Sequence, residues 1–286
     1  MIRLGDIQFL NSWPVTYALR TGIVKSDIQV ISAAPAELNR RLLVGELDAS
    51  AVSSMLYLRH QEELVPIPGL CIRSDGSVKS VLLVSRHPWG ELRGKKIAVS
   101  NQGATTPILL RLLLRQRRLN LTLESTLLRY PEILKEYPAA LLIGDEALLA
   151  SQEVQEKGLV TWDLGEAWTQ WTKLPAVFAL WVIRRHLLQS KPECLEEVAS
   201  LLYSSYEWSR FHPKELLSAM RKTAPFEATF LIRYLGALSY DLDAKAWAGL
   251  RRFAKEAEKI GELPAGTARK LAKASEGKIV TDHRPV

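Results

Sequence analysis

Short apolar runs alternate with segments of helical periodicity through the first half of the chain. Residues 2–9 predict a strand and residues 14–22 a helix opened by Pro14, and the pattern repeats with a strand at 28–32 and a helix at 35–44. A proline in the first helical turn and a glycine just past the last one are the expected start and stop signals of such helices. The alternation is typical of βαβ units, so we predict a largely parallel sheet.

The alternation then breaks and starts again. Two strands, at 67–72 and 78–85, follow each other with no helix between them. After the polar stretch 89–94, a strand at 96–99 and a helix at 107–118 begin a second series. This restart predicts a second lobe.

A long apolar strand at 176–184 is suited to carry the chain back to the first lobe, and from residue 191 onward the periodicity is helical. We therefore predict a first lobe from residues 1–86 and 178–286, with a helical C-terminal section, and a second lobe from residues 87–177. The predicted class is α/β, with two βα lobes around a ligand cleft. In such folds ligands bind where strands end and helices begin.

Composition supports a folded, soluble protein. The 286 residues are 47% hydrophobic and 24% charged, which allows one large domain or two lobes. The two cysteines are far apart in the sequence, and we interpret them as packing residues in a reducing compartment. The chain begins in a strand without an export signal, and no apolar run approaches the roughly 20 residues that cross a bilayer. We expect a cytoplasmic protein with no membrane insertion.

Basic residues outnumber acidic ones by 38 to 31, a formal charge of +7 that favours an anionic partner. They occur as scattered pairs, without a long basic run or a nucleic-acid motif. Arg111, Arg115 and Arg118 share one face of a predicted helix, which is typical of a solvated face. We expect a small anionic ligand and no nucleic acid.

Three predicted turns from a strand to a helix combine hydroxyl or amide side chains with the free N–H groups of a helix start. Such turns bind anions without a fixed positive side chain, although each one alone is more often a plain helix cap. Three turns at one cleft favour a ligand with more than one carboxylate or phosphate. The candidate ligand-binding residues in these turns are Asn11, Ser12, Trp13, Ser53, Ser54, Gly103, Ala104, Thr105 and Thr106.

A fourth turn carries Asp145 and Glu146, whose place at a helix start favours a cap over a general base, and Asp145 is a further candidate substrate-binding residue. Thr106, before Pro107, is expected to cap its own helix, and Trp13 is the aromatic residue expected to flank the cleft. The chain has no zinc, P-loop, dinucleotide or nucleophile-elbow motif. We therefore predict no metal and no nucleotide cofactor.

Six sequence blocks occur in an order that resembles the chorismate dehydratase family of the futalosine route to menaquinone. The blocks are FLNSWP at 9–14, PAELNRRLLVGELD at 35–48, VSS at 52–54, SDGSVKSV at 74–81, LLIGDEA at 141–147 and DLGEAW at 163–168. The segments YLGALSY at 234–240 and GLRRF at 249–253 are similar to the family's helical tail.

This resemblance implies a type II periplasmic-binding-protein fold that works as a cytoplasmic enzyme. It implies the conversion of chorismate to 3-[(1-carboxyvinyl)oxy]benzoate by loss of water, without a cofactor. The family's site positions fall on Asn11, Ser53, Ser54, Ser80 and the 100–106 loop. The chain departs from the family pattern in three places, with Gln8-Phe9, with Met55 after the two serines, and with Lys173 and Ala176 around the Leu174-Pro175 pair.

The expected catalytic residues are Asn11, which would hold the leaving hydroxyl or the side-chain carboxylate, and Ser80, which would hold the ring carboxylate with the N–H groups of Thr105 and Thr106. The substrate's own side-chain carboxylate would then take the proton. A competing assignment makes Asp145 the general base.

Two other functions stay open. One is a non-catalytic cytoplasmic binding protein or sensor for a small cyclic carboxylate, and the other is the related pathway enzyme that acts on a dehypoxanthinylated intermediate. The sequence is compatible with a monomer or a homodimer.

Overall fold

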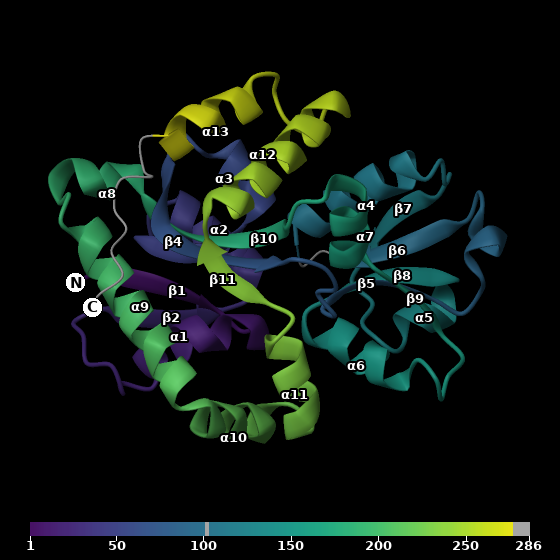
Figure 1. Cartoon of the computed structure of the whole chain (residues 1–286), viewed down its shortest axis with the longest axis horizontal. Helices are drawn as coiled ribbons and strands as arrows, with labels where there is room; N and C mark the ends of the chain where they lie inside the picture. The colour runs from purple at the N-terminus through teal and green to yellow at the C-terminus, as the bar shows by residue number, and fades with distance from the viewer. Residues whose placement is uncertain (101–102, 277–286) are drawn as a thin grey trace.

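The computed structural model describes residues 1–100 and 103–276, which form two β-sheets covered by helices (Figure 1). The first sheet has the order β11-β4-β10-β3-β1-β2. Its strands are β1 (Arg3–Ile7), β2 (Gln29–Ala33), β3 (Ala49–Ser53), β4 (Leu64–Ser74), β10 (Ala176–Arg184) and β11 (Ser239–Leu242). The second sheet has the order β7-β6-β8-β5-β9. Its strands are β5 (Val81–Ser85), β6 (Lys96–Ser100), β7 (Thr122–Thr126), β8 (Ala139–Ile143) and β9 (Val160–Asp163).

The helices divide between the two sheets as the chain order predicts. Those that belong to the first sheet's half of the chain are η1 (Leu10–Ser12), α1 (Trp13–Arg20), α2 (Pro35–Leu43) and α3 (Ser54–Arg59). Those around the second sheet are η2 (Trp89–Leu92), α4 (Thr105–Gln116), α5 (Ile133–Glu136), α6 (Asp145–Glu153) and α7 (Leu164–Thr172). The C-terminal section adds α8 (Arg185–Ser190), α9 (Cys194–Phe211), α10 (Pro213–Thr223), α11 (Ala228–Leu235), α12 (Ala244–Lys259) and α13 (Thr267–Glu276). In Figure 1 these C-terminal helices surround the first sheet, with α10 and α11 at one side and α12 and α13 at the other.

Both sheets are mixed, whereas the sequence predicted largely parallel ones. Strand β1 runs parallel to β2 and β3, and β6 runs parallel to β7 and β8. Strand β10 is antiparallel to β3 and β4, and β5 is antiparallel to β8 and β9. Strand β11 is also antiparallel to β4. Strands β5 and β10 each follow a crossing between the sheets, so no helical crossover on their own sheet imposes a parallel direction on them.

The chain first crosses between the sheets before Val81, earlier than the predicted lobe limit of residue 86. Strand β5 pairs with β8 over Val81–Ser85 and therefore belongs to the second sheet. The sequence placed the two consecutive strands, now β4 and β5, in the first lobe. The segment between them instead connects the first sheet to the second. The chain returns at β10, which lies between β4 and β3 in the first sheet. The division of the chain into two lobes at residues 86 and 178 stays a prediction.

The first crossing is held by Asp163, the N-cap of α7. Its carboxylate accepts hydrogen bonds from the Ser77 hydroxyl at 2.7 Å and from the backbone N–H groups of Val78 and Lys79 at 3.0 and 2.8 Å. The same carboxylate also accepts a hydrogen bond from the backbone N–H of Glu166 at 3.1 Å. This bond caps the N-terminus of α7. One side chain thus ties the crossing segment to the start of α7.

Local signals explain the helices of the first half. Helix α2 starts with Pro35, buries Leu38 and Leu42 on one face, and is followed by Gly45 with a φ of +82°. A left-handed residue just past a helix end favours glycine because it has no Cβ. The predicted helix at 35–44 is confirmed.

The core is continuous along both sheets. Trp168 and Trp181 are 1% and 0% exposed, and burial of a large apolar side chain stabilises the fold by roughly 1.5–3 kcal/mol. A separate cluster joins Leu10 and Trp13 of the first half to Leu148 of α6 and to residues of α10 and α11. Cys71 and Cys194 are buried and free, which agrees with packing residues.

Candidate functional site

Asn11 lies in the short helix η1, directly after the first strand. It is half-buried, and its backbone carbonyl accepts a hydrogen bond from the Tyr240 hydroxyl at 2.9 Å. Within residues 1–100 and 103–276 the structure gives its side-chain amide no hydrogen bond. The C-terminal section therefore holds the backbone of Asn11 and leaves the amide available to a ligand.

Ser12 and Trp13 make structural contacts in the same turn. The buried Ser12 hydroxyl lies 2.7 Å from the Ile7 carbonyl and 2.9 Å from the Phe9 carbonyl, to which it donates. The Trp13 ring is 8% exposed, and it stacks on Tyr17 at 5.5 Å between ring centroids, with the Arg20 guanidinium 4.2 Å from its centroid. Trp13 is therefore a core residue here, and ligand contact by Ser12 and Trp13 stays a prediction.

The turns before α3 and α4 meet across the two sheets. The Thr105 hydroxyl accepts a hydrogen bond from the backbone N–H of Met55 at 2.8 Å. Ser53 is the N-cap of α3, where its side chain accepts from the N–H of Leu56 at 3.3 Å, and the Ser54 hydroxyl donates to the Val177 carbonyl at 2.6 Å. The structure thus brings together two of the three predicted turns, although the hydroxyl groups in them are already hydrogen-bonded.

Helix α4 begins earlier than the sequence suggested. Its N-cap is Ala104, so Thr106 lies inside the first turn, and the expectation that Thr106 caps this helix is wrong. The helix can start before Pro107 because proline in the first turn costs no intrahelical hydrogen bond. Gly103 precedes the cap, and a Cβ on it would lie 3.3 Å from Ile143. Residues 101 and 102 of the predicted loop lie outside the described residues.

Ser80 and Asp145 lie together on the second sheet's side of the same junction. Ser80 is 2% exposed, and its carbonyl accepts a hydrogen bond from the N–H of Gly144 at 2.8 Å. The Asp145 carboxylate accepts from the N–H of Leu10 at 3.5 Å, next to Asn11 in the first half of the chain. Asp145 thus bonds the residue that precedes Asn11, and the residue that precedes Asp145 bonds Ser80.

The expectation that Asp145 caps its own helix is wrong. The N-cap of α6 is Gly144, and no side chain caps this helix. The carboxylate instead points across the junction, where burial raises the pKa of Asp145 to about 6 and the nearby charge of Glu146 adds to the rise. A carboxyl group with this pKa is ionised at pH 7 and is a stronger base than an ordinary aspartate.

Gly144 allows the two halves to come this close. Its φ is +59° and its ψ is −138°, a conformation that is essentially restricted to glycine. A Cβ at this position would lie 3.0 Å from two ring carbons of Phe9. The β8–α6 turn therefore packs directly on the strand end that leads into Asn11.

Two site residues come from the C-terminal section, and the turn patterns did not indicate them. Tyr240 binds the Asn11 carbonyl, and the fully buried ring of Tyr234 packs in the cluster with Leu10 and Leu148. Both belong to the block at 234–240 that the sequence placed only in a helical tail. Helical periodicity marks Tyr234 as a buried face but carries no signal for a contact with residues so far away in the sequence.

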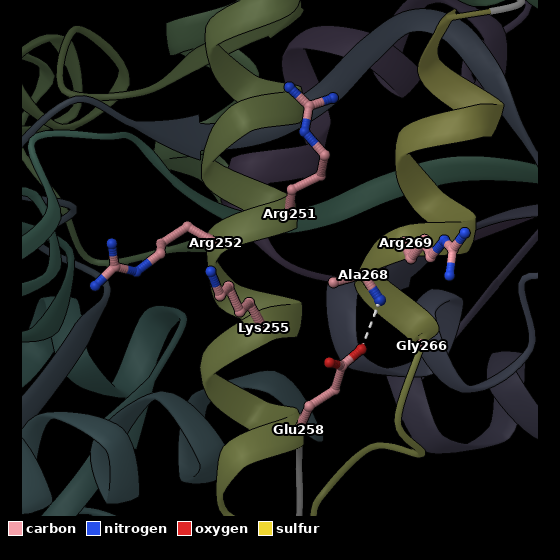
Figure 2. Close-up of a pocket in the computed structure, with 7 residues that line it drawn as sticks. All are labelled: Arg251, Arg252, Lys255, Glu258, Gly266, Ala268 and Arg269. Carbon is pink, nitrogen blue, oxygen red and sulfur yellow. Dashed lines mark hydrogen bonds between the residues drawn. The ribbon is translucent and has the colours of Figure 1, made fainter.

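Two cavities lie away from this junction. One of about 400 Å³ lies over α12 and the start of α13, lined by Arg251, Arg252, Lys255, Glu258, Gly266, Ala268 and Arg269. Figure 2 shows that its cationic side chains point in different directions, while Glu258 accepts a hydrogen bond from the N–H of Ala268 at 2.7 Å. A second, of about 290 Å³, lies by the end of α2 and the start of α8. Neither of these two cavities is lined by a predicted site residue.

The described part of the chain contains neither a metal-binding cluster nor a membrane-spanning helix. No set of three or more His, Cys, Asp or Glu side chains there is arranged to hold a metal ion. No helix there is both long and apolar enough to cross a membrane.

Two sheets with two crossings, and polar turns facing each other between them, define the class of two-lobed binding folds. A protein from Archaeoglobus fulgidus of known crystal structure has this fold, with a TM-score of 0.78 at 22% identity over 91% of this chain and 97% of that one. The periplasmic aliphatic sulphonate binding protein of Escherichia coli also has it, with a TM-score of 0.67 at 15% identity over 94% of this chain and 90% of that one. The predicted periplasmic-binding-protein-like fold is confirmed.

Sequence comparison is more specific than the fold. The family model described as "Menaquinone biosynthesis" matches residues 2–259. The chorismate dehydratase of Thermus thermophilus is 32% identical over 272 residues, which cover 88% of this chain and 93% of that protein. The chain belongs to this menaquinone biosynthesis family, as its six sequence blocks predicted.

Proposed function

We propose that this protein is a chorismate dehydratase, which eliminates water from chorismate to give 3-[(1-carboxyvinyl)oxy]benzoate in menaquinone biosynthesis. The observation that supports the proposal is the junction between the two sheets, where Asp145 accepts a hydrogen bond from the N–H of Leu10, the neighbour of Asn11, and Gly144 donates one to the Ser80 carbonyl. Its similarity to the Thermus enzyme over most of both chains supports the same reaction. A non-catalytic binding protein would share the fold, so the chemistry has to be tested directly.

The reaction needs little from the protein. The ring C–H bond next to the enolpyruvyl ether breaks, its electron pair forms the new ring double bond, and the neighbouring hydroxyl leaves as water with a proton. Aromatisation of the ring drives this elimination, so we propose that it runs without a cofactor. The protein's task is then to hold two carboxylates and a leaving hydroxyl in one orientation.

Neutral donors perform this task in our proposal. The Asn11 amide holds the leaving hydroxyl or the side-chain carboxylate, since the structure leaves this amide unbonded within the described residues. Ser80 and the first N–H groups of α4, at Thr105 and Thr106, hold the ring carboxylate. The substrate enters between the two sheets in our proposal, and the two lobes close on it by a hinge motion of the kind that two-lobed binding folds use.

The proton has two possible acceptors. We propose the substrate's own side-chain carboxylate, held by Asn11. Asp145 is the second candidate, favoured by its position at the junction and its pKa of about 6. A role as general base predicts that Asp145→Asn abolishes turnover while chorismate binding persists, and that wild-type kcat/KM falls as pH drops below about 6. If the substrate supplies the base, the variant keeps turnover.

The deciding experiment is incubation of the purified protein with chorismate, without added metal or nucleotide, followed by mass spectrometry. We expect a product lighter by one water, which is absent with Asn11→Ala. Unchanged chorismate that still protects the protein against thermal unfolding would establish the binding-protein alternative. We further propose that the protein acts in the cytoplasm, as a monomer or a homodimer.

A further inference from the structure

Tyr234 on α11 carries a buried hydroxyl for which the described residues provide no hydrogen-bond partner. The side chain is 1% exposed, and its oxygen is shielded from solvent. Buried hydroxyl groups are almost always paired, because an unpaired one loses its bonds to water without replacement. A buried, unpaired hydroxyl group at a binding site indicates that a ligand supplies the missing hydrogen-bond acceptor.

The position of this hydroxyl is at the junction. The ring packs in the cluster that contains Leu10, the neighbour of Asn11, and Leu148, one turn after Asp145 on α6. The Ser80 hydroxyl lies beside it, but the two groups do not have the geometry of a hydrogen bond. Tyr234 therefore lies near Ser80 and Asp145 and packs in the same cluster as the residue that precedes Asn11.

The protonation state of Tyr234 suits a donor. Burial raises its pKa, the Asp145 charge adds to the rise, and the nearby Ser80 hydroxyl only partly offsets it. The phenol is therefore protonated near neutral pH, so it can donate to an anion.

We propose that Tyr234 is a substrate-binding residue whose hydroxyl donates a hydrogen bond to the ring carboxylate of chorismate, the same carboxylate that Ser80 binds. This rests on the proposed function. A carboxylate between the two hydroxyls supplies the missing acceptor and forms a charge-assisted bond, which is stronger than a neutral one. The C-terminal section then contributes a substrate-binding hydroxyl group to the site, in addition to covering the first sheet.

The test uses Tyr234→Phe, which keeps the ring and its packing and removes only the hydroxyl. We expect kcat/KM for chorismate to fall about tenfold or more, as for a lost hydrogen bond to a charged group, and the dissociation constant for chorismate to rise by a similar factor. The melting temperature should stay the same or rise, because an unpaired buried group is removed. Tyr203→Phe is the matched control, since it removes a hydroxyl that donates to the Pro68 carbonyl at 3.2 Å, and it should leave kcat/KM unchanged.

A double-mutant cycle with Ser80→Ala separates binding from a structural role. Two groups on one carboxylate should give effects on kcat/KM that are not additive. The inference is overturned if Tyr234→Phe lowers the melting temperature but leaves kcat/KM and chorismate binding within about twofold of wild type. It is also overturned if the wild type does not bind chorismate. A wild type that binds chorismate without turnover overturns the proposed function instead, and the dissociation constants then still test Tyr234.

Discussion

At the scale of single residues, burial determines what Asp145 contributes. Its pKa of about 6 lies above the ordinary value of 3.8 because the ionised form is poorly solvated at the junction. The folded state therefore binds a proton more tightly than the unfolded chain does. The free energy of unfolding therefore includes the full contribution of this group below about pH 4. It falls by up to about 3 kcal/mol as the pH rises through about 6 and the carboxylate ionises.

Asp145→Asn should remove this dependence. The amide stays neutral and still accepts from the N–H of Leu10, so the variant should match wild type near pH 4 and exceed it by about 1–3 kcal/mol at pH 7. Urea unfolding at both pH values measures the difference. Asp27→Asn, at an exposed position, controls for the loss of any carboxylate. Equal free energies of unfolding at pH 7 would contradict the buried, ionised carboxylate.

Asn11 and Ser80 allow a second prediction at this scale. Ser80→Ala removes a buried hydroxyl whose nearest acceptor, the Val78 carbonyl, is a distant 3.4 Å away, so little stability should be lost. We expect Asn11→Ala and Ser80→Ala each to lower kcat/KM at least about tenfold, because each removes a donor to developing or fixed charge. Steady-state kinetics with chorismate, together with melting temperatures, measures both effects. Turnover near wild type in both variants would refute the assigned roles.

Sequence patterns located these residues because strand ends and helix starts are local features. Asn11, Ser53 and Thr105 lie at a strand end or a helix start, and the periodicity of the sequence alone indicates these boundaries. Tyr234 and Tyr240 reach the same junction from the far end of the chain, and only long-range packing could place them there. Local periodicity also could not show that Asp145 reaches to Leu10 rather than capping its own helix.

At the scale of elements, the tight β8–α6 turn positions Asp145. Gly144→Ala should destabilise the protein by more than the roughly 1–3 kcal/mol of a strained backbone, because the added methyl also contacts Phe9 at 3.0 Å. Gly158→Ala is a matched control, with a φ of +60° and no atom within 4 Å of the new Cβ. Chemical denaturation compares the two variants. If Gly144→Ala and Gly158→Ala lower the free energy of unfolding equally, the contact with Phe9 adds no cost, and the prediction is wrong.

The N-cap of α7 is a second element to test. Asp163→Ala should lose about 1–3 kcal/mol, since it removes a helix cap and leaves the N–H groups of Val78 and Lys79 without their acceptor. Asp243→Ala is a useful comparison, because Asp243 also caps a helix, by accepting from the N–H of Ala246 at 2.7 Å, while its other partner is the Arg73 guanidinium and not the backbone of the crossing. We expect only Asp163→Ala to change the chorismate KM, which enzyme kinetics would show. An unchanged KM would mean that the crossing keeps its geometry without Asp163.

At the scale of the whole molecule, Glu262 links both halves. This carboxylate, in the turn after α12, pairs with Arg59 of α3 at 3.4 Å and with Arg111 of α4. The arginine side chains are 43% and 51% exposed, so the network contributes less than about 1 kcal/mol and weakens as salt screens it.

Glu262→Gln should favour the open form and raise the chorismate KM by less than about fivefold at low salt, with kcat unchanged. At high salt the difference from wild type should disappear. Glu62→Gln is the control, because it breaks an ion pair with Lys270 that does not involve the second sheet. A KM effect that persists at high salt would assign Glu262 a role other than charge pairing.

The sequence by itself determined the alternation of strands and helices, the return through β10, the family and most of the turns at the junction. These follow from side-chain periodicity, caps and local blocks of residues, which depend on near neighbours in the chain. Only the tertiary structure decided that β5 joins the second sheet, that Asp145 is buried against Leu10, and that Tyr234 completes the junction. Those features depend on which surfaces meet after folding, because burial and long-range contacts are properties of the packed chain.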